Sequence, residues 1–163
     1  MKRFSKLLLI LTLSVTLLLS SCSAQPKSFT VEEITITLTN RFSKLEQEGF
    51  TAVYGSLSAA VMLTREEFAL FEGTTLSADS TVEEYAESVI DAQELKNVEI
   101  KTEDGLTYFI YDGSADGVTY TYLATVHKSK DAFWLIQFGT KADRFANAKS
   151  EFMTFAKSVT FAA

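Results

Sequence analysis

Histidine and cysteine, the side chains that most often act as catalytic bases, nucleophiles and zinc ligands, occur only once each, as His127 and Cys22. His127 follows an apolar run and precedes Lys128, Ser129 and Lys130, which predicts a surface position at a turn. No carboxylate at a local spacing would orient it as a general base. One histidine and one cysteine do not make a zinc site, and no glycine-rich phosphate loop is present. The sequence therefore predicts no cofactor.

Cys22 has a different chemistry, which its position indicates. Three basic residues and an apolar run, residues 7–19, precede it, as in a secretory signal peptide. The run ends in Leu19, Ser20, Ser21 and Cys22, which resembles the lipobox of bacterial lipoproteins. That resemblance implies acylation of the cysteine sulfur and removal of the preceding peptide. Two alternatives are a transmembrane helix, for which the run is short, and an ordinary secretory signal.

Three parts of the chain follow from this interpretation. Residues 1–22 form the lipoprotein signal peptide, residues 23–28 a short tether, and residues 29–163 one folded domain. One acyl chain binds a membrane only reversibly, so a diacylglyceryl thioether is expected at Cys22. We expect the mature protein to be held on the extracytoplasmic side of a bacterial membrane, in the cell envelope, with no free thiol.

One local pattern suits a calcium ligand set. Asp112, Ser114 and Asp116 carry side-chain oxygens at alternate positions before Gly117, as in the first half of a calcium loop. The twelfth position is Leu123, where such a loop requires a bidentate glutamate. Aspartate and glycine are also preferred in tight turns. The sequence therefore favours a β-hairpin turn over a calcium site, and no other metal site is predicted.

Carboxylates are numerous enough for acid–base chemistry. Adjacent pairs such as Glu32 with Glu33, Glu66 with Glu67 and Glu83 with Glu84 point apart on a strand or a helix, which predicts solvated surface. A hydrolytic site would need two acids facing each other across a cleft, and sequence spacing does not show this. A hydrolytic or metal-dependent enzyme built from scattered acids remains the alternative function.

Aromatic residues are the other candidates for recognition. Tyr108 and Phe109 are predicted on opposite sides of one strand, with Tyr111 on the side of Phe109, and Tyr120 and Tyr122 share a side of the next strand. Under a helix these tyrosines would be core, whereas on an uncovered face they would form a recognition surface. The core interpretation is favoured. Trp134 is likewise predicted to be buried against the last helix.

Charge excludes one class of partner. The signal peptide holds three of the fifteen basic residues and none of the twenty-one acidic ones, which leaves a formal charge of −9 on the mature chain. Such a surface is repelled by phosphates, so nucleic acid is not a partner. The same charge argues against a domain that lies flat on anionic lipid. The acyl group is expected to provide the attachment.

The remaining pattern predicts alternating groups of strands and helices. Helices are expected from Ser80, where Ser80 and Thr81 each precede a glutamate by three residues, and over residues 142–157. A helical turn is expected in residues 40–49 and a loop in residues 65–78. The predicted strands are residues 29–38, 50–54, 60–63, 98–101, 106–111, 118–126, 132–138 and 158–161. Short connections between them predict an antiparallel sheet and an α+β fold.

Several hydrophobic segments together resemble a PsbP-like domain. They are Phe-Thr-Ala-Val-Tyr at residues 50–54, Val-Met-Leu-Thr-Arg-Glu at 61–66, Glu-Tyr-Ala at 84–86, Phe-Trp-Leu-Ile-Gln-Phe at 133–138, and Phe152 with Lys-Ser-Val-Thr-Phe at 157–161. The resemblance implies an α/β/α sandwich on an antiparallel sheet. These positions are framework rather than catalytic, so the resemblance implies no activity. We therefore predict a non-enzymatic, lipid-anchored binding or accessory domain whose partner is a protein or a small ligand.

Overall fold

The computed structural model describes residues 24–162. Its helices are α1 (Val82–Ala92) and α2 (Ala142–Lys157), with a short 3₁₀ turn η1 (Phe68–Phe71). Its strands are β1 (Pro26–Val31), β2 (Ile34–Thr39), β3 (Ser43–Leu45), β4 (Ala52–Gly55), β5 (Ala59–Glu67), β6 (Lys101–Glu103), β7 (Leu106–Ala115), β8 (Val118–Lys128), β9 (Ala132–Lys141) and β10 (Thr160–Phe161).

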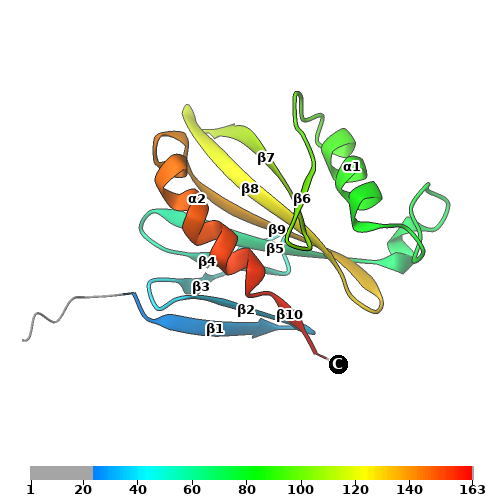
Figure 1. Ribbon diagram of the computed structural model, residues 1–163, viewed down its shortest axis with the longest axis horizontal. Coiled ribbons are helices and arrows are strands. Elements are labelled where there is room, and N and C mark those ends of the chain that lie inside the picture. The colour runs from blue at the N-terminus through cyan, green and yellow to red at the C-terminus, as the bar shows by residue number, and fades with distance from the viewer. Residues whose placement is uncertain (1–23, 163) are drawn as a thin grey trace, which may run out of the picture.

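Two antiparallel sheets organise the chain (Figure 1). The main sheet has the order β3-β4-β5-β9-β8-β7-β6, and the small sheet has the order β1-β2-β10. Strand β9 is central because β5 pairs along one side of it and β8 along the other. These long pairings place residues distant in sequence side by side, such as Arg65 beside Trp134 and Tyr122 beside Gly139.

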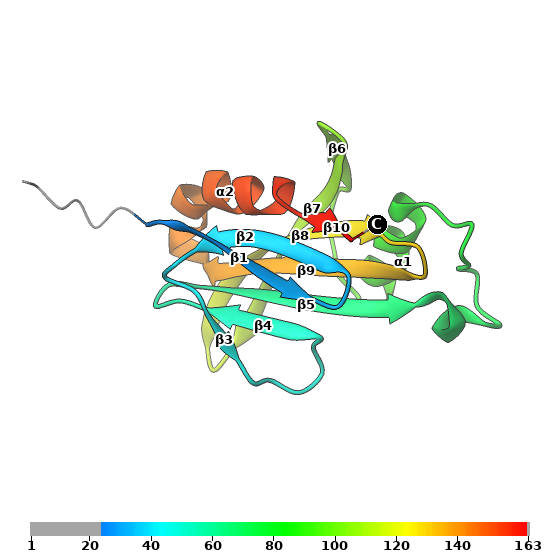
Figure 2. The same ribbon diagram turned by 90° about the horizontal axis from the view of Figure 1, so that it is seen from below.

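The two faces of the main sheet are covered by different helices. Side chains alternate along β9, so Trp134, Ile136 and Phe138 pack in one cluster with α2 and the small sheet. Phe133 and Leu135 pack in a second cluster with α1. Helices on opposite faces of an antiparallel sheet make an α/β/α sandwich, as the sequence predicted. Figure 2 shows β1 and β2 on the same side as α2.

Both predicted helices form for the expected reasons. Thr81 caps α1 by accepting from the Glu84 backbone N–H at 3.1 Å, while the Glu84 carboxylate accepts from the Thr81 N–H at 2.8 Å. Helix α2 has the predicted bounds and buries Phe152, Phe155 and Ala156. None of the helices in residues 24–162 is long and apolar enough to cross a membrane.

The N-terminal segment differs from the prediction. Residues 29–38 are not one strand, because the chain turns at Glu32, which has a positive φ of 49°, and forms the hairpin β1–β2. Strand β1 already begins at Pro26, so residues 26–28, predicted as tether, belong to the sheet. The chain thus reaches the folded domain within a few residues of position 22.

Three further segments differ from the prediction. Residues 40–49 contain the exposed edge strand β3 instead of a helical turn. Residues 65–78 are not all loop, because β5 continues to Glu67 and η1 follows it. Strand β6 lies three residues later than predicted, and β7 continues to Ala115. In each case cross-strand pairing rather than local hydrophobic alternation determines the strand.

Candidate functional site

Tyr111 of β7 and Tyr120 and Tyr122 of β8 lie on the α1 face of the main sheet. Tyr111 and Tyr122 face each other across the two strands, with their rings stacked at a centroid distance of 5.0 Å. The Tyr111 hydroxyl accepts a hydrogen bond from the Gln137 amide, and burial raises the pKa of Tyr111 to about 12. Burial also raises the pKa of Tyr122, with a smaller contribution from Tyr120. Both hydroxyls therefore stay protonated and neutral at neutral pH.

Two glycines make room for the Tyr122 ring. Gly139 lies opposite Tyr122 on β9, and a Cβ placed there would lie 2.6 Å from Cε1 of that ring. A Cβ at Gly113, on β7, would lie 3.1 Å from Cε2. Because neither neighbouring strand carries a side chain at these points, the ring rests closely on the sheet. Tyr122 is consequently held in place by the backbone around it.

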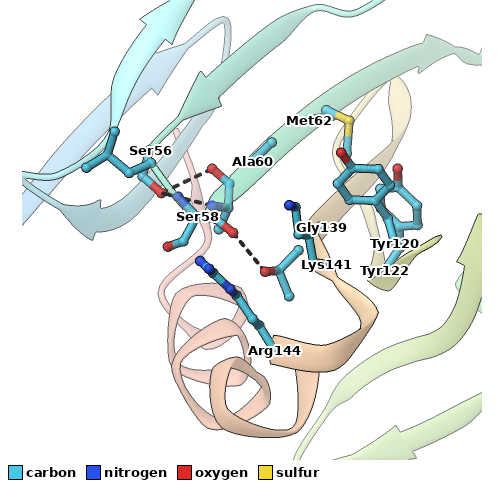
Figure 3. Close-up of a pocket in the computed structure, with 12 residues that line it drawn as sticks. Ser56, Ser58, Ala60, Met62, Tyr120, Tyr122, Gly139, Lys141 and Arg144 are labelled. Atoms are coloured by element: carbon cyan, nitrogen blue, oxygen red, sulfur yellow. Dashed lines mark hydrogen bonds between the residues drawn. The ribbon is translucent and has the colours of Figure 1, made fainter. Parts of the chain in front are cut away.

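Tyr122 and Gly139 border a hollow, the tyrosine pocket, of about 360 Å³ (Figure 3). Tyr120, Tyr122 and Met62 line one side, and the turn of Ser56, Leu57 and Ser58 between β4 and β5 lines another. Lys141 and Arg144, from the end of β9 and the first turn of α2, complete it. None of the described residues that line the tyrosine pocket is a carboxylate. The Thr140 hydroxyl donates to the Ser58 carbonyl at 2.7 Å and ties the turn to β9.

The two cations of the tyrosine pocket, Lys141 and Arg144, have no ion-pair partner among the described residues. Within residues 24–162, neither Lys141 nor Arg144 forms an ion pair with a carboxylate. Lys141 is the N-cap of α2 and Arg144 lies in its first turn, where positive charge opposes the helix dipole at a cost of about 0.3–1 kcal/mol. Helix stability therefore does not explain these cations. They are available for an anionic ligand.

The expectation that the tyrosines are core is confirmed for one and corrected for three. Tyr108 is 2% exposed and packs in the α2 cluster. Tyr111, Tyr120 and Tyr122 are only half-buried, because the cluster under α1 extends as far as Tyr111 and no further. Helix α1 covers only part of its face. The uncovered part is the tyrosine-rich surface that the sequence left as the alternative.

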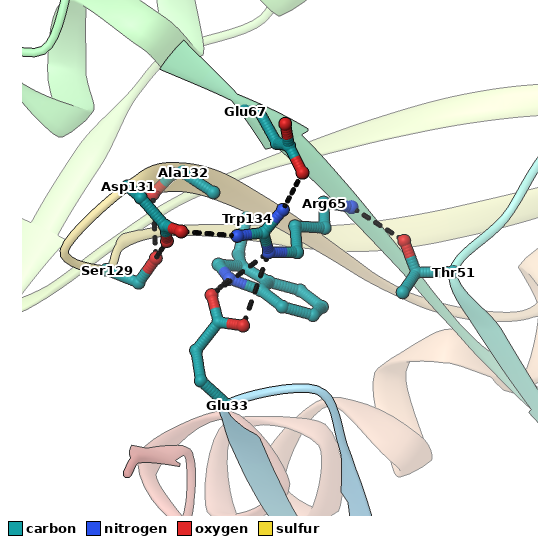
Figure 4. A network of polar contacts seen from close by, with 8 residues as sticks. All are labelled: Glu33, Thr51, Arg65, Glu67, Ser129, Asp131, Ala132 and Trp134. Carbon is teal, nitrogen blue, oxygen red and sulfur yellow. Dashed lines mark hydrogen bonds and ion pairs between the residues drawn. The ribbon is translucent and has the colours of Figure 1, made fainter. Parts of the chain in front are cut away.

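A second polar constellation, the Arg65 network, lies at the other end of β5 and β9 (Figure 4). The Arg65 guanidinium contacts Glu33 at 3.1 Å, Glu67 at 2.7 Å and Asp131 at 2.9 Å. The buried Trp134 donates from Nε1 to the same Glu33 carboxylate at 2.9 Å. The network joins the β1–β2 turn to the β8–β9 turn. Trp134 is buried as predicted, with its indole N–H satisfied by this network.

The pKa of Glu33 indicates a structural role. Partial burial alone would raise this pKa, but hydrogen bonds from Trp134, the Glu33 backbone, Ser129 and Arg65 lower it to about 2. A carboxyl with a lowered pKa stays ionised and is a poor general acid. Glu83 is similar, because its own backbone N–H and the hydroxyls of Thr107 and Thr102 lower its pKa. The predicted solvated surface is therefore wrong for these two glutamates, which are hydrogen-bonded into the fold.

His127 is more buried than predicted. It lies within β8, opposite Trp134, and its Nε2 is 3.1 Å from the Thr125 hydroxyl. Its ring packs against Phe161, and burial lowers its pKa to about 4. His127 is therefore a neutral imidazole packed between Thr125 and Phe161 at the edge of the core. No carboxylate within the described chain hydrogen-bonds it.

The calcium candidates do not converge on a loop. Asp112 and Ser114 lie within β7, and Asp116 lies in the β7–β8 turn with a φ of 51°. The Asp112 carboxylate accepts from the Thr121 hydroxyl across the strands at 2.5 Å. The predicted hairpin is confirmed, but its turn is limited to Asp116 and Gly117, because β7 continues to Ala115. In residues 24–162, no three acidic, histidine or cysteine side chains gather as metal ligands.

Other hollows are bordered by carboxylates on or near α1. A hollow beside α1 contains Glu66, whose carboxylate accepts from the buried Tyr85 hydroxyl at 2.7 Å. Another contains Glu87 and Asp91, one turn apart on α1. The pKa values of Glu33, Glu83 and Asp104 are lowered by their hydrogen bonds, which does not suit a general acid. The residues of the predicted lipid site, Leu19, Ser20, Ser21 and Cys22, lie outside the described residues.

Comparison with known proteins supports the fold. No model of a known protein family matches the sequence, and a search among curated proteins finds no match either. The solution structure of PsbP (CyanoP) from the cyanobacterium Synechocystis sp. PCC 6803 is 19% identical, with a TM-score of 0.58 over 88% of this chain and 96% of that protein. The Saccharomyces cerevisiae Ran-binding protein Mog1p is 10% identical, with a TM-score of 0.55 over 85% and 96%.

A third similar structure comes from Bacteroides thetaiotaomicron. It is 9% identical, with a TM-score of 0.56 over 85% of this chain but 49% of that protein. The layers and strand order define the class as an α+β sandwich with one helix on each face. The fold is that of PsbP and Mog1p, which confirms the predicted PsbP-like fold.

Sequence reasoning missed most of the tyrosine pocket. It identified Tyr120 and Tyr122 as a pair, because both lie on one side of a strand. It did not identify Gly139, Lys141 or Arg144, because only the β8–β9 register brings them beside the tyrosines. The one local signal was that Lys141 and Arg144 carry positive charge at the start of a helix, where acidic residues are favoured.

Proposed function

We propose that this chain is a lipid-anchored extracytoplasmic binding domain whose ligand occupies the tyrosine pocket. The observation that carries the proposal is the uncovered pair Tyr120 and Tyr122 beside two cations that have no partner within residues 24–162. Exposed aromatic side chains next to unpaired charge are typical of recognition surfaces. The ligand is either a protein segment or a small molecule, and it carries negative charge.

The fold supports a binding rather than a catalytic role. Mog1p, which has the same fold, is a Ran-binding protein. The alternative, a hydrolytic or metal-dependent enzyme, would require facing acids with raised pKa values. In the described chain the resolved carboxyl pKa shifts of Glu33, Glu83 and Asp104 are all downward. We therefore propose an accessory domain without enzymatic activity.

The membrane attachment rests on the sequence. Leu19, Ser20, Ser21 and Cys22 match the lipobox, and Cys22 is the only cysteine. We propose residues 1–22 as the signal peptide and Cys22 as the lipidated first residue of the mature protein. Cys22→Ala should move the protein from the membrane fraction to the soluble extracytoplasmic fraction. Retention of the variant in the membrane fraction would contradict the anchor.

Photo-crosslinking in living cells tests the pocket separately. A photoreactive side chain at Met62, inside the tyrosine pocket, should form an adduct, whereas one at the exposed Leu70 should not. Replacing Lys141 and Arg144 by glutamate should abolish the Met62 adduct, because the charge of the pocket is reversed. Equal adducts at Met62 and Leu70, or an adduct that survives the charge reversal, would contradict the proposal.

A further inference from the structure

The tyrosine pocket lies at the end of the domain where the described chain begins. Strand β1 starts at Pro26, which pairs with Thr39, and the Asn40 backbone N–H donates to the Gln25 carbonyl at 2.7 Å. Thr39 in turn borders a second hollow of about 430 Å³, which shares Ser56, Leu57 and Ser58 with the tyrosine pocket. Figure 1 shows the start of β1, the β4–β5 turn and the first turn of α2 at the same side of the molecule.

Covalent geometry then limits the distance to the membrane. Four residue steps separate Cys22 from Pro26, and a chain spans at most ~3.3–3.6 Å per residue. If Cys22 carries the acyl chains, Pro26 at the start of β1 stays within about 14 Å of the lipid surface. The Arg65 network lies at the opposite end of the same strands.

The composition of this end suits a lipid surface. Leu57 is at the tip of the β4–β5 turn and is fully exposed at 107%. Tyr120 and Tyr122 have the amphipathic rings that are enriched at membrane interfaces. Lys141, Arg144 and Arg41 are cations around the two hollows, and Glu151 is the one carboxylate among the residues that line them. An apolar tip with tyrosines and cations behind it matches the order of acyl chains and anionic headgroups.

We propose that this end docks on the membrane, with Leu57 in the interface and the headgroup of an anionic phospholipid between Lys141, Arg144 and the tyrosines. This inference rests on the proposed function and names the ligand of the same pocket. The charge of −9 on the mature chain opposes broad electrostatic attachment, so the contact is confined to one end. It need not be strong, because the tether gives the pocket a high effective concentration of lipid.

The parent sequence allows a clean fluorescence test, because Cys22 is its only cysteine. The lipidated protein is reconstituted on vesicles of phosphatidylcholine with phosphatidylglycerol, carrying Leu57→Cys labelled with an environment-sensitive dye. The dye should show a several-fold rise in emission and quenching by spin-labelled lipid. Leu70→Cys is the matched control, since Leu70 is also an exposed leucine, 69% exposed, but follows the far end of β5. Its dye should show neither change.

A second arm tests the headgroup. The combined Lys141→Gln and Arg144→Gln variant should reduce the Leu57→Cys signal to the level seen on pure phosphatidylcholine. The proposal would be overturned by an unchanged signal in this variant or by equal signals at positions 57 and 70. It would also be overturned by a signal that requires added membrane protein, or by one that appears with free phosphate alone. Labelling of the parent protein by the dye would show that Cys22 carries a free thiol, which would contradict the anchor. This result differs from a failure of docking, in which the parent protein stays unlabelled.

Discussion

Arg65 and Arg144 are arginines at opposite ends of the same strands, but their surroundings differ. Arg65 is half-enclosed by Glu33, Glu67 and Asp131, and each of its terminal nitrogens has a carboxylate partner. Arg144 is exposed beside an open hollow and, within residues 24–162, has none. Removing one member of a charge pair inside a protein destabilises the fold because the other charge is left uncompensated, whereas a charge without a partner is free to bind something else. We therefore assign a structural role to the Arg65 end and a role in recognition to the Arg144 end.

The largest expected effect is the loss of Arg65. Arg65→Met should lower the free energy of unfolding by about 2–4 kcal/mol, since it leaves the partly buried Glu33 carboxylate without its cation. Arg144→Met makes the same chemical change at the other end and should alter stability by less than about 0.5 kcal/mol. Urea unfolding of both variants measures this. Equal losses would mean that the two arginines do not differ in role.

Acid should weaken the Arg65 end specifically. The pKa of Glu33 lies at about 2 in the folded protein against an ordinary 4.5, so between these values the unfolded state binds more protons. Its contribution is complete above about pH 5.5 and is lost as the pH falls toward 2. The stability difference between the parent protein and Glu33→Gln should therefore shrink by about 2 kcal/mol over this range. A difference that stays constant with pH would contradict this role of Glu33.

The pocket end has its own packing constraint, of smaller size. Gly139→Ala should cost about 1–2 kcal/mol, because the new methyl group would overlap the Tyr122 ring. In a Tyr122→Ala background the same change should cost almost nothing, and the double-mutant cycle measures the coupling. An equal cost in both backgrounds would mean that Gly139 is required by the strand and not by the tyrosine.

The smallest expected effect concerns calcium. The β7–β8 turn contributes Asp116 to the pocket end, and a cation bound there would make that end a metal site instead of an anion site. Millimolar calcium should leave the melting temperature unchanged, because Asp112 and Asp116 belong to a hairpin. A rise of several degrees in a thermal scan would overturn the assignment.

The sequence predicted those elements whose local pattern matches their final environment. Helix α2 was predicted to its last residue because Phe152, Phe155 and Ala156 follow helical spacing toward the core. The β1–β2 hairpin was missed because its turn uses Glu32 at positive φ, without glycine, asparagine or proline. Strand β3 was missed because all three of its residues are exposed at an edge.

The sites depended on long-range pairing in the same way. The Arg65 network combines residues 33, 65 and 131, which only the β5–β9 register and the β1–β2 turn bring together. Of the tyrosine pocket, only the pair Tyr120 and Tyr122 was predicted, because the two residues share one side of a strand. Whether a helix covered them was a question of tertiary packing, to which the sequence offers no local signal.

Amide hydrogen exchange of the lipidated protein, compared between vesicles and detergent micelles, tests the division between the two ends most directly. Docking at the pocket end predicts slower exchange on vesicles at residues 56–60 and 141–144, with unchanged exchange at residues 32–33 and 129–134. Slower exchange on vesicles at the Arg65 end would contradict the assignment of recognition to the tyrosine pocket. The same exchange rates on vesicles and on micelles at both ends would contradict it as well.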